Sequence, residues 1–463
     1  MPRRKSASSR KSVAVENPAK VGAGQVPVAR VGRFKIALAA LFCVGALVLL
    51  GIRARQALLL LKAPPLRCLS DNAVLPPIPP PSEGNEIQVR AAWEAIEPFR
   101  PSARYRPREP GDWLALARQA RAAGDFITAR TAYKAALRMS PRCDLKAYDE
   151  LGDVALSLGL LDEALATYRR LEALAPAEAV GYIGESRTLL AMGKDAQGRD
   201  ALRRGARHLA PANAPGHLGL SVLFDGELEF ADAFREAEAA RAAAPHDANV
   251  LLSLANLYRE HHDLAKARRL AEEVVQMLPD APEAHRILGE ILDDPSDPHR
   301  DRAQAENQYL EALDRDPHDQ KALEELGKLY LEEDRLRPAL YMYTLLLAER
   351  PNDGKARLVI AQGYDRLGDH RTAATQRALG YPLAARANQV AALIVGREQF
   401  PRDPQRRVRL ANLLMQEGRY REALVELQAA HCLRPSWREP LSLLEKAFHR
   451  LRIPLPPWLA HSG

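Results

Sequence analysis

Apolar and small residues return along the chain with a period of about 34 residues, beginning near Gly111. Within one period, large apolar residues three and four positions apart form one face of a helix. Two copies read Trp113, Leu116, Ala117, Ala120, Gly124, Ala129, Tyr133, Ala136, Pro141 and Tyr148, Leu151, Gly152, Ala155, Gly159, Ala164, Tyr168, Leu171, Pro176. A glycine or polar turn in the middle ends a first helix, and the proline separates one copy from the next. Each period therefore predicts a helix–turn–helix unit.

No single unit can bury its own apolar face, so the units are expected to stack. We place nine unit starts near residues 110, 145, 179, 214, 248, 282, 320, 354 and 404. One longer interval comes from an enlarged inner turn over Asp293–His299, and the longest from an irregular stretch in which we expect an extra helix over Leu383–Gln399. The third unit departs in residue type, with Glu185, Gly198 and Gly205 where Leu and Ala are usual. The predicted fold class is all-α, a tandem helix-turn-helix repeat solenoid.

Residues of these types at these spacings resemble the tetratricopeptide repeat (TPR) family over roughly residues 110–435. The resemblance implies a TPR-like superhelix of about nine units, with helices that cap each end. The predicted organisation of the body is a capping helix and linker at 88–109, units one to eight at 110–387, an irregular helical insertion at 388–403, unit nine at 404–435, and a capping helix and tail at 436–463.

The chain before the repeats contains one uncharged apolar run, residues 36–52, which is just short of the length needed to cross a bilayer. A buried core helix or the apolar part of a signal peptide would also be apolar, but the basic segment before the run is long for a signal peptide and no cleavage site follows directly. We therefore predict a single transmembrane anchor over 35–61. Nine Lys and Arg residues precede the run and four follow it before Asp71, which favours a cytoplasmic N-terminus and a repeat body across the membrane.

Two further segments flank the predicted anchor. Residues 1–34 are basic and rich in small residues, and we expect a disordered tail. Residues 62–87 contain seven prolines, which favour extended polyproline II structure over a helix. We interpret this segment as a proline-rich spacer, although a ligand for SH3- or WW-type domains has the same composition.

Charge is divided unevenly along the 463 residues. The formal net charge is +7, yet the first 70 residues hold thirteen Lys and Arg and one acid, which leaves 53 basic and 58 acidic residues in the rest. The basic balance therefore belongs to the tail and anchor flanks, and we predict no nucleic-acid partner. Four cysteines exclude a scaffold built on disulfides, and whether Cys68 and Cys143 pair is left open.

Candidate catalytic and metal-binding chemistry is sparse. No phosphate-binding loop, nucleophile elbow, zinc-protease or C-x-x-C motif occurs. The acidic turn with Asp293, Asp294 and Asp297 lacks the glycine and final glutamate of a calcium loop, and we interpret it as a solvated turn. His285 replaces a large residue of the repeat and is expected to be a packed core histidine. We predict no enzyme activity, no cofactor and no metal.

The TPR resemblance implies that the first helix of each unit lines a concave groove, mainly through its second, fifth, ninth and twelfth positions. Asn at the ninth position is informative, because one side-chain amide can serve a backbone donor and an acceptor together. The alternative is a merely hydrated face. Leu252 and Val408 stand where chaperone-binding members carry Lys, which argues against such a clamp. The candidate partner-binding residues are Arg118, Arg121, Asp149, Asp153, Asn249, Asn256, Arg259, Glu290, Lys321, Lys328, Gln362 and Asn412.

The leading hypothesis is a non-catalytic, membrane-anchored scaffold that binds a partner protein or peptide in this groove. Its composition suggests a bacterial single-pass protein of the inner membrane, with the repeats in the periplasm and a role in envelope assembly, secretion or export. The alternatives are an accessory subunit of an envelope enzyme such as a polysaccharide glycosyltransferase, and a mitochondrial-type import receptor. A homo-oligomer is compatible with the same sequence.

Overall fold

The computed structural model describes residue 66 and residues 75–81, 86–96, 107–142 and 144–460. Within these ranges the regular secondary structure is helical and contains no strand. The predicted tail and anchor, and most of the predicted spacer, lie outside them. In the described part of the chain, no helix combines the length and the apolar character needed to cross a bilayer. All of these ranges belong to one compact unit, Pro64–Gly463.

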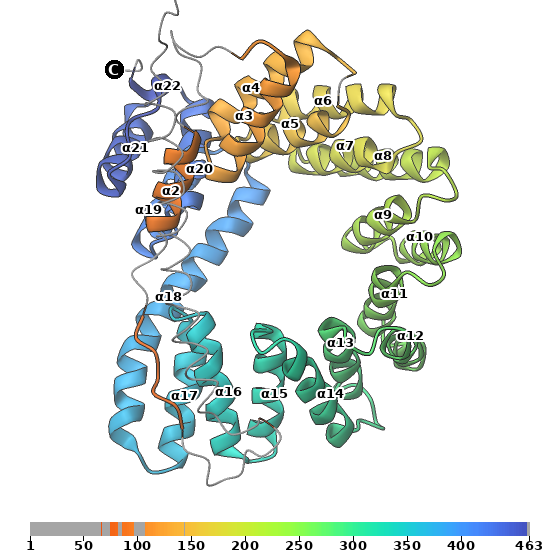
Figure 1. Ribbon diagram of the computed structural model, residues 1–463, viewed down its shortest axis with the longest axis vertical. Helices are drawn as coiled ribbons and strands as arrows, with labels where there is room; N and C mark the ends of the chain where they lie inside the picture. The colour runs from red at the N-terminus through yellow and green to blue at the C-terminus, as the bar shows by residue number, and fades with distance from the viewer. Residues whose placement is uncertain (1–65, 67–74, 82–85, 97–106, 143, 461–463) are drawn as a thin grey trace, which may run out of the picture. The chain divides into compact units, whose positions relative to one another are not determined.

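The helices alternate as the first and second members of each predicted unit (Figure 1). A short helix precedes the units and two follow them. In chain order they are α2 (Glu86–Ile96), α3 (Pro110–Ala123), α4 (Phe126–Met139), α5 (Lys146–Ser157), α6 (Leu161–Leu174), α7 (Ala179–Ala191), α8 (Asp195–His208), α9 (Ala214–Gly226), α10 (Phe230–Ala243), α11 (Ala248–Glu260), α12 (Leu264–Met277), α13 (Pro282–Leu292), α14 (Arg302–Arg315), α15 (Gln320–Glu332), α16 (Leu336–Glu349), α17 (Gly354–Arg366), α18 (His370–Gln399), α19 (Pro404–Gln416), α20 (Tyr420–Leu433), α21 (Arg438–Leu451) and α22 (Pro457–Ala460).

Local sequence explains where these helices begin and end. An aspartate precedes many of them and caps free backbone N–H groups of the first turn, as Asp353 does for Ala356 and Asp403 for Gln405. The turn inside a unit needs a left-handed residue, and Gly124 takes this conformation with φ 90°. These signals recur in register, so the helical pairs follow from short-range sequence.

Small residues on the first helices accept the ring of an aromatic residue from a second helix. A Cβ atom added to Gly152 would lie 2.4 Å from the Tyr168 ring, and one added to Gly184 would lie 2.1 Å from it. Tyr168 is fully buried between these two glycines, which belong to consecutive units. The Tyr168 ring therefore joins α6 to α5 within unit two and also joins unit two to α7 of unit three.

The third unit keeps its packing despite its unusual residues. Glu185 is 2% exposed, and its carboxylate pairs with Arg169 and Arg204. Burying a carboxylate is tolerated when cations and hydrogen bonds compensate for lost hydration. An ion pair therefore takes the place of the usual Leu.

The irregular stretch differs from the expected separate helix. The second helix of unit eight does not stop before the proline but continues through it as α18, a single helix of 30 residues that contains Pro382. A Cβ atom added to Gly354 of α17 would lie 2.7 Å from the Gly380 carbonyl and 2.2 Å from the Ala384 amide nitrogen. Close packing of α17 along this part of α18 supports the helix where a proline would otherwise weaken it.

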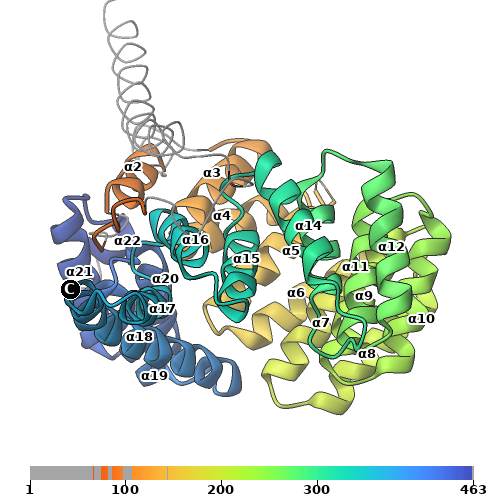
Figure 2. The ribbon, with the colours of Figure 1, turned by 90° about the horizontal axis from the view of Figure 1, so that it is seen from below.

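The two ends of the array meet. Helix α20 contacts α4 and α5, and α2 contacts α20 and α21. Figures 1 and 2 accordingly show the blue C-terminal helices beside the orange N-terminal ones. We call the contact of α19–α20 with α3–α5 the seam.

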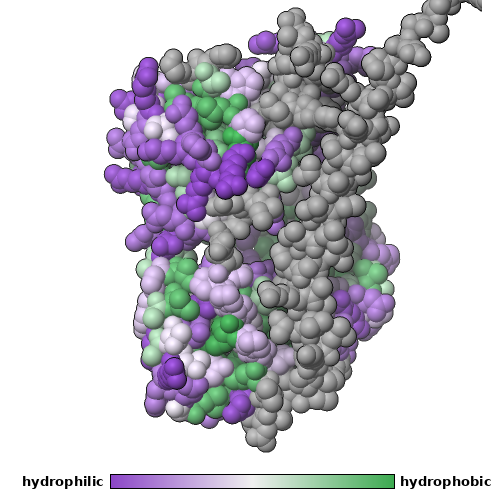
Figure 3. All heavy atoms as spheres, turned by 60° about the vertical axis from the view of Figure 1, so that its left-hand side comes forward, coloured by the Kyte–Doolittle hydropathy of each residue, from purple (hydrophilic) through white to green (hydrophobic). Residues whose placement is uncertain are grey.

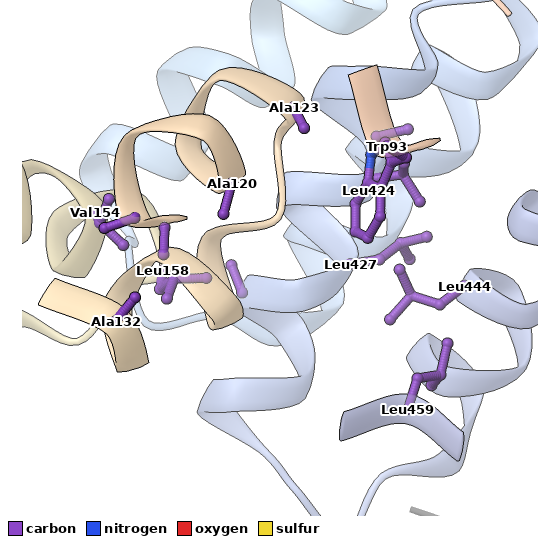
Figure 4. Close-up of a cluster of buried hydrophobic side chains, with 14 of the residues drawn as sticks. Trp93, Ala120, Ala123, Ala132, Val154, Leu158, Leu424, Leu427, Leu444 and Leu459 are labelled. Carbon is purple, nitrogen blue, oxygen red and sulfur yellow. The ribbon is translucent and has the colours of Figure 1, made fainter. Parts of the chain in front are cut away.

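One hydrophobic core runs across the seam and includes residues of α2–α5 and α19–α22. Figure 4 shows Trp93 of α2 against Leu424 of α20, with Leu444 and Leu459 beyond, and alanines of α3 and α4 on the other side. Trp93 also meets Phe448 edge-on at 4.7 Å between ring centroids. The helices expected to cap opposite ends therefore share one core.

The outer surface next to the C-terminal helices is mixed in character. Figure 3 shows small apolar groups separated by hydrophilic residues on the face that it presents. Several apolar side chains of α18 and its C-terminal cap are exposed, among them Tyr381, Val395 and Phe400.

Candidate partner-binding surface

The first helices of the units lie on the inner side of the array. Figure 1 shows α9, α11 and α13 inside α10, α12 and α14. The predicted groove residues all belong to such first helices, from α3 to α19. Their immediate contacts fall into three groups.

The N-terminal group forms a network of ion pairs between consecutive first helices. Arg118 Nε lies 2.9 Å from Glu150 Oε2, and Arg121 lies 3.6 Å from Asp153. Asp153 also pairs with Arg187 at 3.2 Å. Arg118, Arg121 and Asp153 are therefore brought together, but mainly to satisfy one another. Sequence reasoning missed the central acid Glu150, which is 5% exposed.

Asp149 lies beside this network and makes no ion pair of its own within the described residues. Its burial, together with the nearby Asp153 carboxylate, raises the pKa of Asp149 to about 6. The Tyr168 hydroxyl donates to Asp153 at 3.0 Å, which fixes the orientation of that carboxylate. This end of the surface is consequently rigid and internally balanced.

The central group gathers around Glu290 on α13. The Lys321 ammonium lies 2.9 Å from Glu290, and Arg259 lies 3.9 Å from it on the other side. Arg286 of the same helix also pairs with Glu290 and then reaches Asp319 at 3.2 Å. Lys328 points to other acids, Glu324 and Glu325, at 3.2 and 3.0 Å. These predicted residues thus link α11, α13 and α15 through ion pairs in which the cations and the acids balance.

The third group consists of side-chain amides. Asn249 and Gln362 are exposed, and Asn256 and Asn412 are half-buried. Within the described part of the chain these four amides make no hydrogen bond. Each therefore keeps a free donor and a free acceptor on a first helix. They are the predicted groove residues whose polar capacity is left for a partner.

A second polar pattern, at the fourth position of several units, was not recognised in the sequence. Tyr148, His285 and Arg407 occupy this position in different units, and each contacts the carbonyl of the proline before its unit, at 2.9 Å for Pro141, 2.8 Å for Pro279 and 3.1 Å for Pro401. A carbonyl can only accept, so Nε2 of His285 is the donor in this contact. His285 is 5% exposed, which confirms the expected core histidine. The signal was available, because Arg407 stands where the repeat usually has a large apolar residue.

Arg407 uses its remaining donors to hold the seam. It is 2% exposed, donates to the Ser157 carbonyl of α5 at 2.9 Å, and pairs with Glu426 at 3.0 Å. Burial lowers the pKa of its guanidinium, while Glu426 favours the charged form. Gln428 complements it: its amide donates to the Gly124 carbonyl at 2.8 Å and accepts from the Ile127 N–H at 3.1 Å.

The glycines of the first two inner turns serve the seam as well. A Cβ atom added to Gly159 would lie 2.9 Å from the Pro401 carbonyl, and one added to Gly124 would lie 3.1 Å from the Arg421 side chain. Arg421 in turn donates to the Ala122 carbonyl at 2.9 Å. The turn signature that ends the first helices therefore also lets unit nine approach them.

A hollow of ≈ 880 Å³ lies next to the seam, between α5–α8 and α18–α20. Among its charged lining residues, Glu426 pairs with both Arg397 and Arg407. Other lining residues are apolar, among them Leu156, Leu190, Val395 and Leu414.

A buried acid pair connects α6 and α7 near the N-terminal group. Burial and the neighbouring Glu185 carboxylate raise the pKa of Glu172 to about 8, while a hydrogen bond with Glu172, together with Arg169 and Arg204, holds the pKa of Glu185 below its usual range. Within the described residues no three His, Cys, Asp or Glu side chains gather as metal ligands do. In the acidic turn, the Asp293 carboxylate accepts a hydrogen bond from Arg300 at 2.6 Å.

Cys432 is a free thiol, and burial raises its pKa to about 11. Cys68 and Cys143 lie outside the described residues.

Comparison with known families and proteins supports the repeat prediction. Residues 114–179, 252–294 and 299–354 match the family model described as tetratricopeptide repeat. Cellulose synthase operon protein C of Xanthomonas axonopodis pv. citri is 35% identical over 170 residues, which is 36% of this chain and 10% of that protein. The matched segment thus represents about a tenth of that relative's length.

Solved structures with related arrangements include a crystal structure of MamA (18% identity, 36% of this chain and 96% of that one, TM-score 0.33) and PilF of Pseudomonas aeruginosa (23% identity, 43% and 88%, TM-score 0.35). The human IFIT1 dimer with m7Gppp-AAAA covers 76% of this chain and 95% of its own at 14% identity and a TM-score of 0.38. At such identities and TM-scores these likenesses support no functional conclusion.

Proposed function

We propose that this chain is a non-catalytic scaffold which holds a segment of a partner protein along its first helices. Its match to the tetratricopeptide repeat model over residues 114–179, 252–294 and 299–354 supports such a fold. The observation that carries the proposal is the set of free amides at Asn249, Asn256, Gln362 and Asn412. An extended peptide offers backbone N–H and C=O groups, and a side-chain amide can serve both. The charged groove residues act in this proposal as a rigid frame.

The proposal places the scaffold at a membrane. The support is the uncharged run at 36–52 with its basic flanks, and the charge bias favours a repeat body in the bacterial periplasm. Tethering near a bilayer would raise the effective concentration of a partner in the same membrane. Resistance of the full chain to alkaline extraction from membranes, with release of a chain lacking residues 35–61, tests the anchor.

Site-specific photo-crosslinking in cells tests the groove. A photoreactive residue is introduced into the full chain at position 256 or 412, and at the control positions Asp200 on α8 and Gln276 on α12. Both control residues are exposed on second helices. One dominant adduct from positions 256 and 412, absent from the controls, supports groove binding. Equal crosslinking at all four positions, or crosslinking at the controls alone, contradicts it.

Binding measurements sharpen the test once that partner is in hand. Asn256→Ala combined with Asn412→Ala is expected to weaken affinity about tenfold or more, since each lost hydrogen bond costs about 0.5–1.5 kcal/mol. Asn352→Ala, in the loop between units, is the matched control and should leave affinity within about twofold. Unchanged affinity in the double variant would contradict the role of the amides.

A second candidate function is an accessory subunit of an envelope polysaccharide glycosyltransferase whose active site lies on another chain. The similarity to cellulose synthase operon protein C over 170 residues favours this candidate. It predicts stable co-purification with one membrane glycosyltransferase in detergent, and loss of the exported polymer when this chain is removed. A crosslinked partner outside polysaccharide synthesis, with polymer output unchanged, would exclude it.

A further inference from the structure

The proline segment, residues 75–81, makes a contact that a free spacer does not need. The segment runs across α17 and α18 in Figure 1 and reads Leu-Pro-Pro-Ile-Pro-Pro-Pro. The Pro79 carbonyl accepts a hydrogen bond of 2.8 Å from Nη2 of Arg357 on α17, 278 residues later in the chain. Arg357 is fully buried.

Arg357 occupies the fourth position of unit eight, equivalent to Arg407 in unit nine. Like Arg407, it first binds the carbonyl of the proline before its unit, Pro351, at 2.7 Å. Its Nη1 donates to Gln376 at 3.0 Å. Units five and seven carry Leu251 and Leu323 at this position and pack without any donor. The guanidinium is therefore not required by the repeat, and its spare donor is directed at the proline segment.

The acceptors around Arg357 are all neutral, and no carboxylate pairs with it within the described residues. A fully buried cation without a counter-ion is costly unless its N–H groups find acceptors. The Pro79 carbonyl is one of three acceptors of its two Nη groups, while its Nε–H is buried without an acceptor in the described part of the chain. Removing the segment would leave that donor without its acceptor.

Burial along residues 75–80 repeats every three residues, and Pro81 after them is exposed. Leu75 and Pro76 are half-buried and Pro77 is exposed, and then Ile78 and Pro79 are half-buried and Pro80 is exposed. Polyproline II helices have three residues per turn, so this pattern places one edge of the segment against the protein and the other in solvent. Such docking of a preformed extended helix is a known mode of peptide recognition.

We infer that the α17–α18 face around Arg357 is a recognition site for an extended proline-rich peptide, and that residues 75–81 are its tethered ligand. The site recognises an apolar residue followed by proline at two successive turns, Leu75–Pro76 and Ile78–Pro79. Arg357 donates to the carbonyl of Pro79. This docking leaves residues 62–74 as the part of the predicted spacer before the docked segment. The inference is independent of the groove on the first helices.

A labelled synthetic peptide spanning residues 73–83 tests the site on full-length protein by fluorescence anisotropy. The acceptor chain carries Leu75→Ser and Ile78→Ser, which remove the inward-facing residues of its own segment. This chain is expected to bind the peptide about tenfold more tightly than the wild-type chain, in which the tethered segment competes at an effective concentration on the order of 1 mM. Equal binding by the two chains, or binding by neither, overturns the inference.

Matched peptides make the test independent of any variant that fails to fold. On the same acceptor chain, a peptide with Leu75→Ser and Ile78→Ser should bind at least tenfold more weakly. A peptide with Pro77→Ala and Pro80→Ala, at the exposed positions, should stay within about threefold of the unchanged peptide. If the inward and outward changes weaken binding alike, the proposed register is wrong.

Arg357→Leu in the acceptor chain then tests the donor. Leucine is the residue of units five and seven at this position, so the helical signal and thermal unfolding should remain cooperative. The variant is expected to lose at least tenfold in peptide affinity. Undiminished affinity in a folded Arg357→Leu chain would show that the guanidinium does not recognise the segment.

Discussion

The middle of the array and its seam are built from the same repeat but connected differently. In the middle, units four to seven contact their sequence neighbours, and Ala214, Ala240 and Val250 of α9, α10 and α11 form one small apolar cluster. At the seam, α19–α20 pack on α3–α5, and the Gln428–Ile127 hydrogen bond joins residues 301 positions apart. Stability in the middle is therefore a sum of neighbour contacts, whereas the seam couples the two ends of the chain.

The fourth unit position shows how one repeat serves both regions. In unit six, His285 contacts Gln308 of the same unit and the carbonyl of Pro279, the proline just before that unit. In unit nine, Arg407 makes the equivalent contacts with Glu426 and Pro401 and then reaches Ser157. A longer side chain with five donors converts a local tie into a long-range one.

The largest expected effect comes from removing the long-range tie. Arg407→Leu leaves the buried Glu426 with only Arg397 and the Ser157 carbonyl without its donor, and we expect a loss of about 3–5 kcal/mol in the free energy of unfolding. His285→Leu, the matched change in the middle, should cost about 1 kcal/mol. Urea unfolding measures both. Equal losses would erase the distinction between seam and middle.

A smaller difference is expected between two turn glycines. Gly159 and Gly193 have φ 75° and 70°, but only at Gly159 would a Cβ atom meet another segment, the Pro401 carbonyl at 2.9 Å. Gly193→Ala should cost about 1 kcal/mol from backbone strain alone. Gly159→Ala should cost about 2–3 kcal/mol, because it also displaces unit nine. Hydrogen exchange should show faster opening of α19–α20 in Gly159→Ala only; the same exchange pattern in both variants would contradict the seam contact.

The smallest effect concerns the acid pair between seam and middle. The pKa of Glu172 is raised to about 8, so the folded state holds a proton that the unfolded state releases near its ordinary value. Stability must then fall as pH rises from about 4.5 through 8, and the contribution is fully lost above 8. Glu172→Gln cannot ionise, and we expect its melting temperature to match the wild type at pH 5 and to exceed it by about 1–2 °C at pH 8.5.

Glu445→Gln provides the control for this pH dependence, because Glu445 is exposed on α21. Its melting temperature should follow the wild type at both pH values. A Glu172→Gln chain that loses as much stability as the wild type between pH 5 and pH 8.5 would show that the pair does not hold a proton.

Much of the local architecture was predictable from residue types and spacing. The spacing from Leu151 to Pro176 indicates two helices and a turn, and the structure places α5 and α6 there. The predicted groove residues do lie on first helices. Their contacts were not predictable, because whether Arg121 faces solvent or Asp153 depends on how far one unit rotates against the next. The same holds for Glu185, whose two arginine partners come from neighbouring helices.

The period, the helical pairs and the turns follow from residue types and spacing, because they depend on contacts within about 34 residues. Closure of the array, the contacts of Arg407 and Arg357 with distant backbone carbonyls, and the free state of some groove side chains depend instead on how the helices pack. Closure depends on the sum of small rotations between successive units, and this sum cannot be predicted from the sequence of a single repeat. The local sequence identifies Gly159 as a turn residue. Its close contact with the Pro401 carbonyl is formed only when the two ends of the array pack together.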